Sequence, residues 1–394
     1  MIPKGELFAL RAEWSLTDEV IEKDYVLGWL LAGIAAEPSL RDQWVFKGGT
    51  ALRKCYFETY RFSEDLDFTV LRGGPEEPAD LVPIFQRIST WLQDACGVRL
   101  VVDDTSFRRR KNRRGNQTTE GKLAYSGPRQ PPSMPKVKLD LTSDELLADL
   151  PVERPISHPY SDTPTAIPQV RCYAIAELLA EKLRAIVERC RPRDLYDVIH
   201  LYRHPDLALA APKVRDLLAR KCAFANVVPP TLASVHASPF RADLEQEWGN
   251  MLAHQLPALP PLDQFWNALE DLFRWLEGTA AIITPAPRLV VPGPPIDPLW
   301  RPSPMMSTWR SGAPIEIVRF AGANRLKVRL DYRAEAGRRG PRVVEPYSLR
   351  RTNDGHLLLY VVNDRGEPRS YRVDRIAGAE VTNETFSPRY AVEF

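Results

Sequence analysis

Nine prolines fall within residues 279–314 of this 394-residue chain. Proline lacks a backbone N–H and fixes φ, so neither a helix nor a strand can run through such a segment. A chain of this length has room for two or three hydrophobic cores. The sequence therefore predicts a proline-rich linker over 279–314 and a separate unit of residues 315–394 behind it.

The hydrophobic periodicity differs between the parts of the chain. Residues 1–160 alternate helical and strand patterns, which indicates an α+β core. Residues 161–278 show helical spacing and predict a bundle. Beyond the linker, short apolar runs separated by turn residues begin with "IEIVRFAG" at 315–322 and predict strands of a small β-barrel. The expected fold class is α+β with a C-terminal β-barrel.

Composition narrows the class of protein but not its partner. The chain is 44% hydrophobic and carries a formal net charge of +2, typical of a soluble globular protein. No apolar run approaches the roughly 18 residues of a membrane span, and the first residues lack a signal sequence. The five cysteines form no CxxC pair, so neither a zinc site nor a disulfide framework is expected. We expect a cytoplasmic protein without membrane contact.

Two carboxylates stand one residue apart in "FKGGTALRKCYFETYRFSEDLDFTV", residues 46–70. Strand alternation puts Asp65 and Asp67 on one face and Leu66 and Phe68 on the opposite, buried face. Like charges this close repel each other unless a cation lies between them. The pair therefore predicts a site for Mg²⁺ or Mn²⁺, hard ions that take oxygen ligands and phosphates.

The glycines before this strand supply the other half of a site. Gly48 and Gly49 would let the backbone approach a phosphate closely, and a helix starting at Thr50 would aim N–H groups at it. Asp140, on a later strand with Lys138 on the same face, could complete a two-metal arrangement. A lone Gly-Gly is usually only a turn and a lone DxD usually solvated surface. Their combination in one strand–turn–helix–strand unit favours function.

This unit resembles the nucleotidyltransferase superfamily of the DNA polymerase β type, whose signature is hG[GS], a helix and then DxD. It is more closely similar to the AbiEii/MenT toxin family, the nucleotidyltransferase partners of type IV-like toxin–antitoxin systems. The resemblance spans roughly residues 10–275. Further blocks match in the expected order at 21–31, 122–128, 136–142 and 177–198.

The resemblance implies a polymerase β-like fold and Mg²⁺-dependent transfer of NMP from an NTP to a hydroxyl. The expected acceptor is RNA, foremost the tRNA 3′ end, with a protein hydroxyl as the alternative. A cognate antitoxin is a further expected partner, and Ser63 matches a serine that antitoxins phosphorylate in some members. Asp197 follows Asp194 on the same helical face, so spacing does not separate their roles. The implied roles are triphosphate binding for Gly48, Gly49, Thr50, Ser63 and Lys182, metal binding for Asp65, Asp67 and Asp140, and catalysis for Asp65, Asp67, Lys182 and Asp194.

A dense basic cluster occupies "SFRRRKNRRGNQ", residues 106–117, with six basic residues among seven positions. Self-repulsion predicts a mobile loop. A merely solvated loop is the simple interpretation, but beside a nucleotidyltransferase centre a polyanionic RNA acceptor is favoured, because counterion release makes such clusters good nucleic-acid contacts. The predicted RNA-binding residues are Arg108, Arg109, Arg110, Lys111, Arg113 and Arg114.

Residues 330–388 resemble a WYL domain, an Sm-like β-barrel common in bacterial transcription regulators and phage-defence proteins. The match lies in "VVEPYSLRR", "RSYRVDRI" and the turn "NDRGEP", whereas the Trp-Tyr-Leu positions read Leu357, Leu358 and Leu359. Alternation predicts Arg372 and Asp374 on one strand face and Arg375 on the other. Guanidinium groups suit phosphate, so a nucleic acid or nucleotide is the expected ligand, with salt-bridged surface arginines as the alternative. The implied ligand set is Tyr347, Ser348, Arg350, Arg351, Arg372 and Arg375.

Taken together, these features predict a nucleotidyltransferase toxin of a toxin–antitoxin or phage-defence system, regulated by a ligand-sensing WYL domain. The other hypothesis from a different class is a WYL nucleic-acid-binding regulator with an inert transferase fold. Against it, every acidic position of the expected site is filled.

Overall fold

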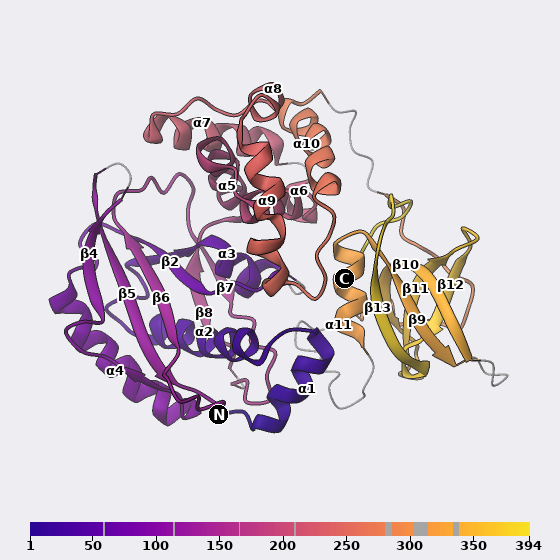
Figure 1. The fold of residues 1–394 in the computed structure, drawn as a ribbon, viewed down its shortest axis with the longest axis horizontal. Helices are drawn as coiled ribbons and strands as arrows, with labels where there is room; N and C mark the ends of the chain where they lie inside the picture. Colours follow the sequence, from indigo (N-terminus) through magenta and orange to yellow (C-terminus); the bar gives the residue numbers. More distant parts are fainter. Residues whose placement is uncertain are drawn as a thin grey trace.

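The computed structural model contains one eight-stranded sheet, a group of helices and a smaller five-stranded sheet (Figure 1). Among the described helices, none combines the length and the hydrophobicity needed to cross a membrane. The structure describes residues 1–57, 60–112, 115–164, 166–208, 210–279, 286–300, 302, 314–333 and 339–394.

The large sheet has the strand order β3-β5-β6-β2-β1-β8-β7, and β4 also pairs with β5. The predicted strands that flank the glycine turn and the one that carries Asp140 are confirmed. The strands are β1 Trp44–Lys47, β2 Asp65–Val70, β3 Arg99–Val101, β4 Phe107–Lys111, β5 Gln117–Ser126, β6 Lys136–Thr142, β7 Val152–Pro155 and β8 Gln169–Cys172.

The two faces of this sheet differ in polarity because side chains alternate along each strand. Leu66, Phe68 and Leu139 are fully buried on one face, in a core that also contains residues of α1 (Lys4–Trp14), α2 (Asp18–Ala36) and α4 (Pro78–Cys96). The other face carries Asp65, Asp67 and Asp140. We call it the polar face. The expected division of β2 into a buried and a polar side is confirmed.

The helical part follows the sheet, as the periodicity predicted. Tyr173, just before its first helix, bonds through its hydroxyl to Thr69 Oγ1 of β2 at 2.7 Å and so joins the helices to the polar face. Figure 1 shows these helices gathered beside the sheet, with the short α3 (Gly48–Ala51) near them. The helices are α5 Ile175–Arg189, α6 Pro192–Tyr202, α7 Ala211–Ala225, α8 Leu232–His236, α9 Phe240–Leu252 and α10 Leu262–Glu277.

The C-terminal module, residues 315–394, begins differently from the prediction. The segment expected to be a strand at 315–322 is helix α11, Ile315–Ala323. Its side chains are buried almost all round, since it packs on α1 as well as on strands of the module. In a short run that is buried on several sides, nearly every residue is apolar whether the run is a strand or a helix. Hydrophobic periodicity alone therefore could not distinguish the two.

The module's strands form an open antiparallel sheet in the order β12-β11-β10-β9-β13, and the closed barrel that was predicted is wrong. Strands β12 and β13 lie at opposite edges, joined by the one-turn 3₁₀ helix Val373–Arg375. The predicted strand alternation of Arg372, Asp374 and Arg375 is also wrong. Strand β12 ends at Arg372, so Asp374 and Arg375 lie in the 3₁₀ helix and not in a strand. The strands are β9 Leu326–Arg333, β10 Arg339–Arg351, β11 Leu357–Asn363, β12 Pro368–Arg372 and β13 Ile376–Thr385.

Residues 286–300 of the proline-rich segment contain no helix or strand. They nevertheless pack on the C-terminal module: Leu289 is buried against it, and the Asp297 N–H donates to the Arg351 carbonyl at 2.8 Å. The domain boundaries proposed at 160, 278 and 314 stay predictions.

The basic cluster is not the loop that its charge suggested, because Arg108 to Lys111 lie in β4, paired with β5. Carboxylates offset its self-repulsion: Arg109 pairs with Glu77 at 2.9 Å and Arg110 with Glu120 at 3.0 Å. A charged strand at the edge of a sheet also discourages pairing with another chain. Arg113 and Arg114 lie outside the described residues.

Candidate active site

The carboxylates of the polar face converge because β2 and β6 run parallel in register. Asp67 lies directly opposite Asp140, and Asp65 opposite Lys138. Burial raises the pKa of Asp67 to about 6, and the charges of Asp65 and Asp140 add to the rise. Asp140 is paired with Lys138 at 2.5 Å, whereas Asp65 and Asp67 repel each other and are a donor set that a hard divalent cation would stabilise.

The glycine turn packs directly against these carboxylates. Gly48 has φ +81°, and a Cβ added there would lie 2.2 Å from Asp67 Oδ2. A Cβ on Gly49 would lie 2.5 Å from Arg61 Nη2 and 3.0 Å from Ser63 Oγ. The side chains of Asp67, Arg61 and Ser63 occupy the places that a Cβ would take, so only glycine lets the turn approach them this closely. We call this glycine turn the cradle.

Thr50 occupies the cradle with its hydroxyl already engaged. Its Oγ1 donates to the Asp65 carbonyl oxygen at 2.5 Å, which ties the turn to β2. The helix begins at Gly48, two residues earlier than expected, and continues from α3 as a π-helical turn, Leu52–Tyr56. In this structure Thr50 therefore positions the turn, and the triphosphate-binding roles expected for Gly48, Gly49 and Thr50 stay predictions.

Lys182 of α5 lies among acidic groups with its side chain only 12% exposed. Its Nζ lies 2.7 Å from Asp197 Oδ2 and 3.3 Å from Asp194 Oδ1 of α6. Burial alone would lower its pKa, but these two carboxylates outweigh burial and raise it. Lys182 is therefore held as a fixed positive charge.

The structure separates the two aspartates that sequence spacing could not. Asp197 is fully buried and accepts hydrogen bonds from Arg61 Nε at 2.7 Å, Arg61 Nη2 at 2.8 Å and the Tyr60 hydroxyl at 2.5 Å. Asp194 instead accepts from Arg189 Nε at 2.8 Å. Burial opposes ionisation of both, yet the neighbouring cations hold both pKa values below the usual range. Both are therefore ionised at neutral pH and are paired with cations, and the catalytic role expected for Asp194 stays a prediction.

Three basic residues that sequence reasoning missed surround the carboxylates. Lys47 lies opposite Asp67 in the β1–β2 ladder, and burial lowers its pKa to about 8. The charge of Asp67 also acts on Arg189, and that of Asp65 on Arg193. The available signals were that Lys47 immediately precedes the glycines and that both arginines fall within the 177–198 block.

The residues present fit a divalent cation with a polyphosphate. Among the described residues, no group of three or more Asp, Glu, His or Cys side chains is arranged to enclose a metal ion. Mg²⁺, however, is commonly held by one or two carboxylates together with substrate phosphates. Asp65 and Asp67 beside the Gly48 cradle supply the protein's share of such a site, and Asp140 lies next to them.

Comparison with known proteins agrees with a site for a divalent cation and a polyphosphate. Residues 29–272, more than half of the chain, match the family described as nucleotidyl transferase AbiEii toxin, type IV toxin–antitoxin system. The chain belongs to the AbiEii nucleotidyltransferase toxin family. Residues 315–381 match the WYL domain. No curated protein matches the chain significantly.

Two solved structures are similar to this AbiEii-family chain. The nucleotidyltransferase toxin MenT4 from Mycobacterium tuberculosis has 20% sequence identity and a TM-score of 0.49, over 71% of this chain and 91% of that one. Proteasome accessory factor B/C of Arthrobacter aurescens has 18% identity and a TM-score of 0.19, over 55% of this chain and 32% of that one. The family assignment rests on the sequence match and not on these two similarities.

The six residues proposed as a WYL ligand set lie on β10, on β12 and on the 3₁₀ turn that follows it, and the set stays a prediction. Arg350 and Arg372 lie in one row, because both pair with Leu358 of β11. Tyr347 and Ser348 are fully buried within the module. Arg350 is paired with Glu393, and Arg372 with Asp374 at 2.6 Å. The remaining two, Arg351 and Arg375, lie on β10 and on the 3₁₀ turn.

Gly48→Ala is expected to destabilise the protein more than Gly73→Ala. Both glycines have positive φ, 81° and 87°, so each alanine carries a left-handed strain of about 1 kcal/mol. Only at position 48 would the new Cβ also collide with Asp67, since nothing lies within 4 Å at Gly73. Urea unfolding should show a larger loss for Gly48→Ala by at least about 1 kcal/mol. Equal losses would contradict the close approach of the turn to Asp67.

Asp67→Asn is expected to stabilise the metal-free protein. Because the folded pKa of Asp67 is raised, the stability linked to this group is present at low pH and is lost as pH rises through about 6. Removing the charge should therefore raise the free energy of unfolding by about 1–2 kcal/mol at pH 7.5 and by much less at pH 5. Chemical denaturation in EDTA measures this, with the exposed Asp104→Asn as control. A loss of stability at pH 7.5 would show that the charge is satisfied without a cation.

Proposed function

We propose that this AbiEii-family nucleotidyltransferase transfers NMP from an NTP to an RNA hydroxyl in a Mg²⁺- or Mn²⁺-dependent reaction, with the tRNA 3′ end as the expected acceptor. The supporting observation is the pairing of an acidic patch with basic groups: Asp65 and Asp67 lie beside the Gly48–Gly49 cradle, and Lys47, Lys182 and Arg189 lie around it. A metal–triphosphate carries charges of both signs: the metal ion would bind the acidic patch, and the phosphates would face the basic groups.

The chain's own residues would bind and orient the nucleotide. The glycine cradle would let the backbone approach the phosphates beside Asp67. Lys182 and Arg189 are both held in place by Asp194. They would face the negative charge that develops on the phosphate oxygens during transfer. Fixed cations of this kind stabilise a phosphoryl transition state without reorganising during the reaction.

The transfer itself is an in-line displacement. The acceptor oxygen forms a bond to the α-phosphorus while the bond from that phosphorus to the bridging oxygen of pyrophosphate breaks. The bound divalent ion would neutralise charge on the attacking and leaving oxygens. Asp140 lies opposite Asp67 with its side chain 39% exposed and pairs with Lys138 at 2.5 Å. We infer that this more accessible carboxylate would receive the acceptor's proton. Asp194, predicted as an alternative for this step, is fully committed to Lys182 and Arg189.

An RNA acceptor is favoured because basic residues of β4 lie on the polar face, in register with the active-site carboxylates. Arg108, Glu120, Asp140 and Asp67 lie opposite one another on successive strands, which places Arg108 about 14 Å from Asp67. Arg110 lies on the same face, two residues along β4. Arg109 and Lys111 lie on the opposite face, where Arg109 pairs with Glu77. Of the four predicted RNA-binding residues in β4, Arg108 and Arg110 therefore lie on the polar face, the side of the active site.

The cellular role proposed is that of a toxin in a phage-defence or toxin–antitoxin system. Modified tRNA ends would block aminoacylation and stop translation. The WYL domain would regulate the transferase by binding a ligand, and an antitoxin protein would be the cognate partner. We retain nucleotidylation of a protein hydroxyl as the second candidate, since the same site chemistry serves either acceptor.

Asp65→Ala/Asp67→Ala is expected to abolish nucleotide transfer. Purified protein is incubated with total tRNA, Mg²⁺ and each of the four α-³²P-labelled NTPs. We expect label on tRNA with the wild type, and a loss of at least 1,000-fold in the double variant, because its metal-holding carboxylates are gone. The matched control is Asp94→Ala/Asp104→Ala, which removes two exposed aspartates. Label on protein instead of RNA would show that the acceptor is a protein hydroxyl. Undiminished label in Asp65→Ala/Asp67→Ala would show that these carboxylates are not the active site.

Neutralising the site-facing half of the basic strand tests the RNA acceptor. Arg108→Gln/Arg110→Gln should weaken tRNA binding and reduce the slope of log affinity against log salt by up to about 2, because two phosphate contacts are lost. Arg109→Gln/Lys111→Gln removes the same charge from the opposite face and should have a smaller effect. Binding measured by filter retention between 50 and 200 mM salt distinguishes them. Equal effects of the two pairs would argue against an RNA path along the polar face.

A further inference from the structure

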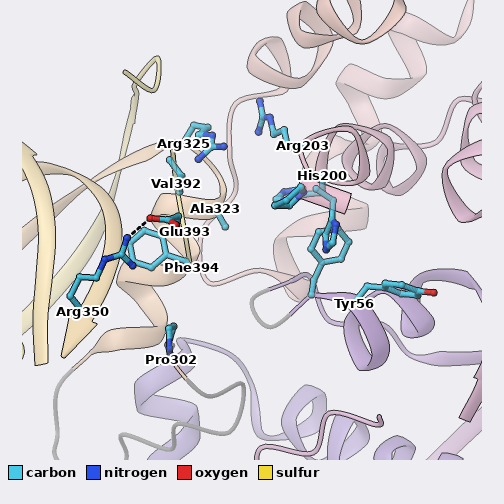
Figure 2. Close-up of a pocket in the computed structure, with 13 residues that line it drawn as sticks. Tyr56, His200, Arg203, Pro302, Ala323, Arg325, Arg350, Val392, Glu393 and Phe394 are labelled. Atoms are coloured by element: carbon cyan, nitrogen blue, oxygen red, sulfur yellow. Dashed lines mark hydrogen bonds and ion pairs between the residues drawn. The ribbon is translucent and has the colours of Figure 1, made fainter. Parts of the chain in front are cut away.

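A pocket of about 450 Å³ lies between the helical part and the C-terminal module. Residues from both sides line it, including Tyr56, His200 and Arg203 of the transferase and Arg325 and Phe394 of the module. Figure 2 shows Arg203 and Arg325 at the same end of this pocket, one from each side. We call it the interdomain pocket. Its volume is within the range of small-molecule sites.

Two cations in this pocket lack anionic partners. Neither Arg203 nor Arg325 forms an ion pair with any described residue, and Arg203 Nη1 has no hydrogen-bond partner there. Arg325 makes only a long hydrogen bond, 3.4 Å from its Nη1 to the Gly322 carbonyl. Burial lowers the pKa of Arg203 to about 10 and of Arg325 to about 9, and Arg203 adds its repulsion to Arg325. Holding two such charges together costs stability unless an anion binds between them.

Glu393, the acidic side chain among the described residues that line the pocket, does not supply that anion. Glu393 is already paired with Arg350 and with Arg288, the latter at 3.0 Å. His200 is neutral because burial lowers its pKa to about 3, and its Nε2 lies 3.2 Å from Asn324 Oδ1. The remaining surface is largely aromatic and apolar, with Tyr56, Phe57 and Phe394 among its residues.

We propose that the interdomain pocket binds a phosphorylated nucleotide, with its phosphate between Arg203 and Arg325 and its base against the aromatic side chains. Two guanidinium groups are suited to bidentate phosphate binding, and aromatic rings stack on a base. The site is distinct from the transferase centre, and its two unpaired cations, Arg203 and Arg325, do not belong to the ligand set expected for a WYL domain. Arg350 of that set also lines the pocket, where it is paired with Glu393.

The two transferase elements that line this pocket, helix α6 and the π-helical turn that ends at Tyr56, also contain or adjoin residues of the active site. Helix α6 carries Asp194 and Asp197 near its start and His200 near its end, with Arg203 directly after it. Tyr56 ends the π-helical turn that continues from the Gly48–Gly49 cradle. A nucleotide that bridges the two units would therefore bear on two elements that position catalytic groups. This consequence, unlike the binding itself, rests on the proposed function.

The test measures binding without catalysis. Full-length protein carrying Asp65→Asn/Asp67→Asn is titrated calorimetrically in EDTA with AMP, GMP, CMP and UMP and with the four corresponding nucleosides. At least one monophosphate should bind, and its nucleoside should bind at least 10-fold more weakly. Arg203→Gln/Arg325→Gln should weaken the monophosphate at least 10-fold, whereas Arg329→Gln, an exposed arginine of β9 paired with Glu380, should not.

Thermal melting separates ligand binding from a structural role. Because the two charges are uncompensated, Arg203→Gln/Arg325→Gln should melt at the same or a higher temperature than the parent without ligand, and should lose the shift that the nucleotide causes. The proposal is overturned if no monophosphate binds, if the double variant retains the parent's affinity, or if the nucleoside binds equally well. It is also overturned if the variant melts markedly lower, since the arginines would then be stabilising the interface themselves.

Discussion

Repulsion among three carboxylates on one face of the large sheet is the constraint around which the active site is organised. Asp65, Asp67 and Asp140 are brought together by the register of β2 and β6, and backbone pairing leaves them no way to separate. Burial, followed by the charges of Asp65 and Asp140, raises the pKa of Asp67 to about 6, so its ionised form is disfavoured in the metal-free fold at neutral pH. A site that is costly when empty is one that binds a cation well, and natural enzymes commonly give up stability for such sites.

The positive side of the site depends on a second set of buried ions. Asp197 is bound by Arg61, Tyr60 and Lys182, and Asp194 by Lys182 and Arg189. Desolvation penalises each of these charges, but every one has an opposite partner and hydrogen bonds, which is the condition under which buried ion pairs persist. The network fixes Lys182 and Arg189 where their charge can act on a bound triphosphate. Asp194 therefore contributes by holding cations in place.

Much of this was predictable from sequence because it depends on local periodicity. Alternation alone placed Asp65 and Asp67 on a polar face with Leu66 and Phe68 behind them, and the glycine turn and the long helices were where their patterns indicated. The errors arose where tertiary context decides. Helix α11 is buried on several sides, so its pattern could not reveal its period, and the basic strand β4 forms because β5 offers both backbone partners and Glu120.

Other features were invisible to sequence because they join distant residues. Spacing placed Asp194 and Asp197 on one helical face, yet only Arg61 and Arg189, from different segments, give them different roles. Arg203 and Arg325 are 122 positions apart and meet because the residues directly after α11 contact the helical part. There Asn324 Oδ1 accepts hydrogen bonds from Tyr196 and His200 of α6, and the Asn324 carbonyl accepts one from Gln264 of α10. That docking gives the two units a shared pocket, and α6 links this pocket to the active site.

The central claim is that the carboxylates of β2 and the cations of α5 and α6 jointly hold a metal–triphosphate. A crystal structure of the wild-type protein with Mn²⁺ and a non-hydrolysable NTP tests it most directly, because the anomalous signal locates the ion without ambiguity. The account predicts Mn²⁺ within coordination distance of both Asp65 and Asp67, with the triphosphate beside Gly48 and reaching toward Lys182 and Arg189. An ion bound elsewhere, or a triphosphate on the far side of the sheet, would contradict it.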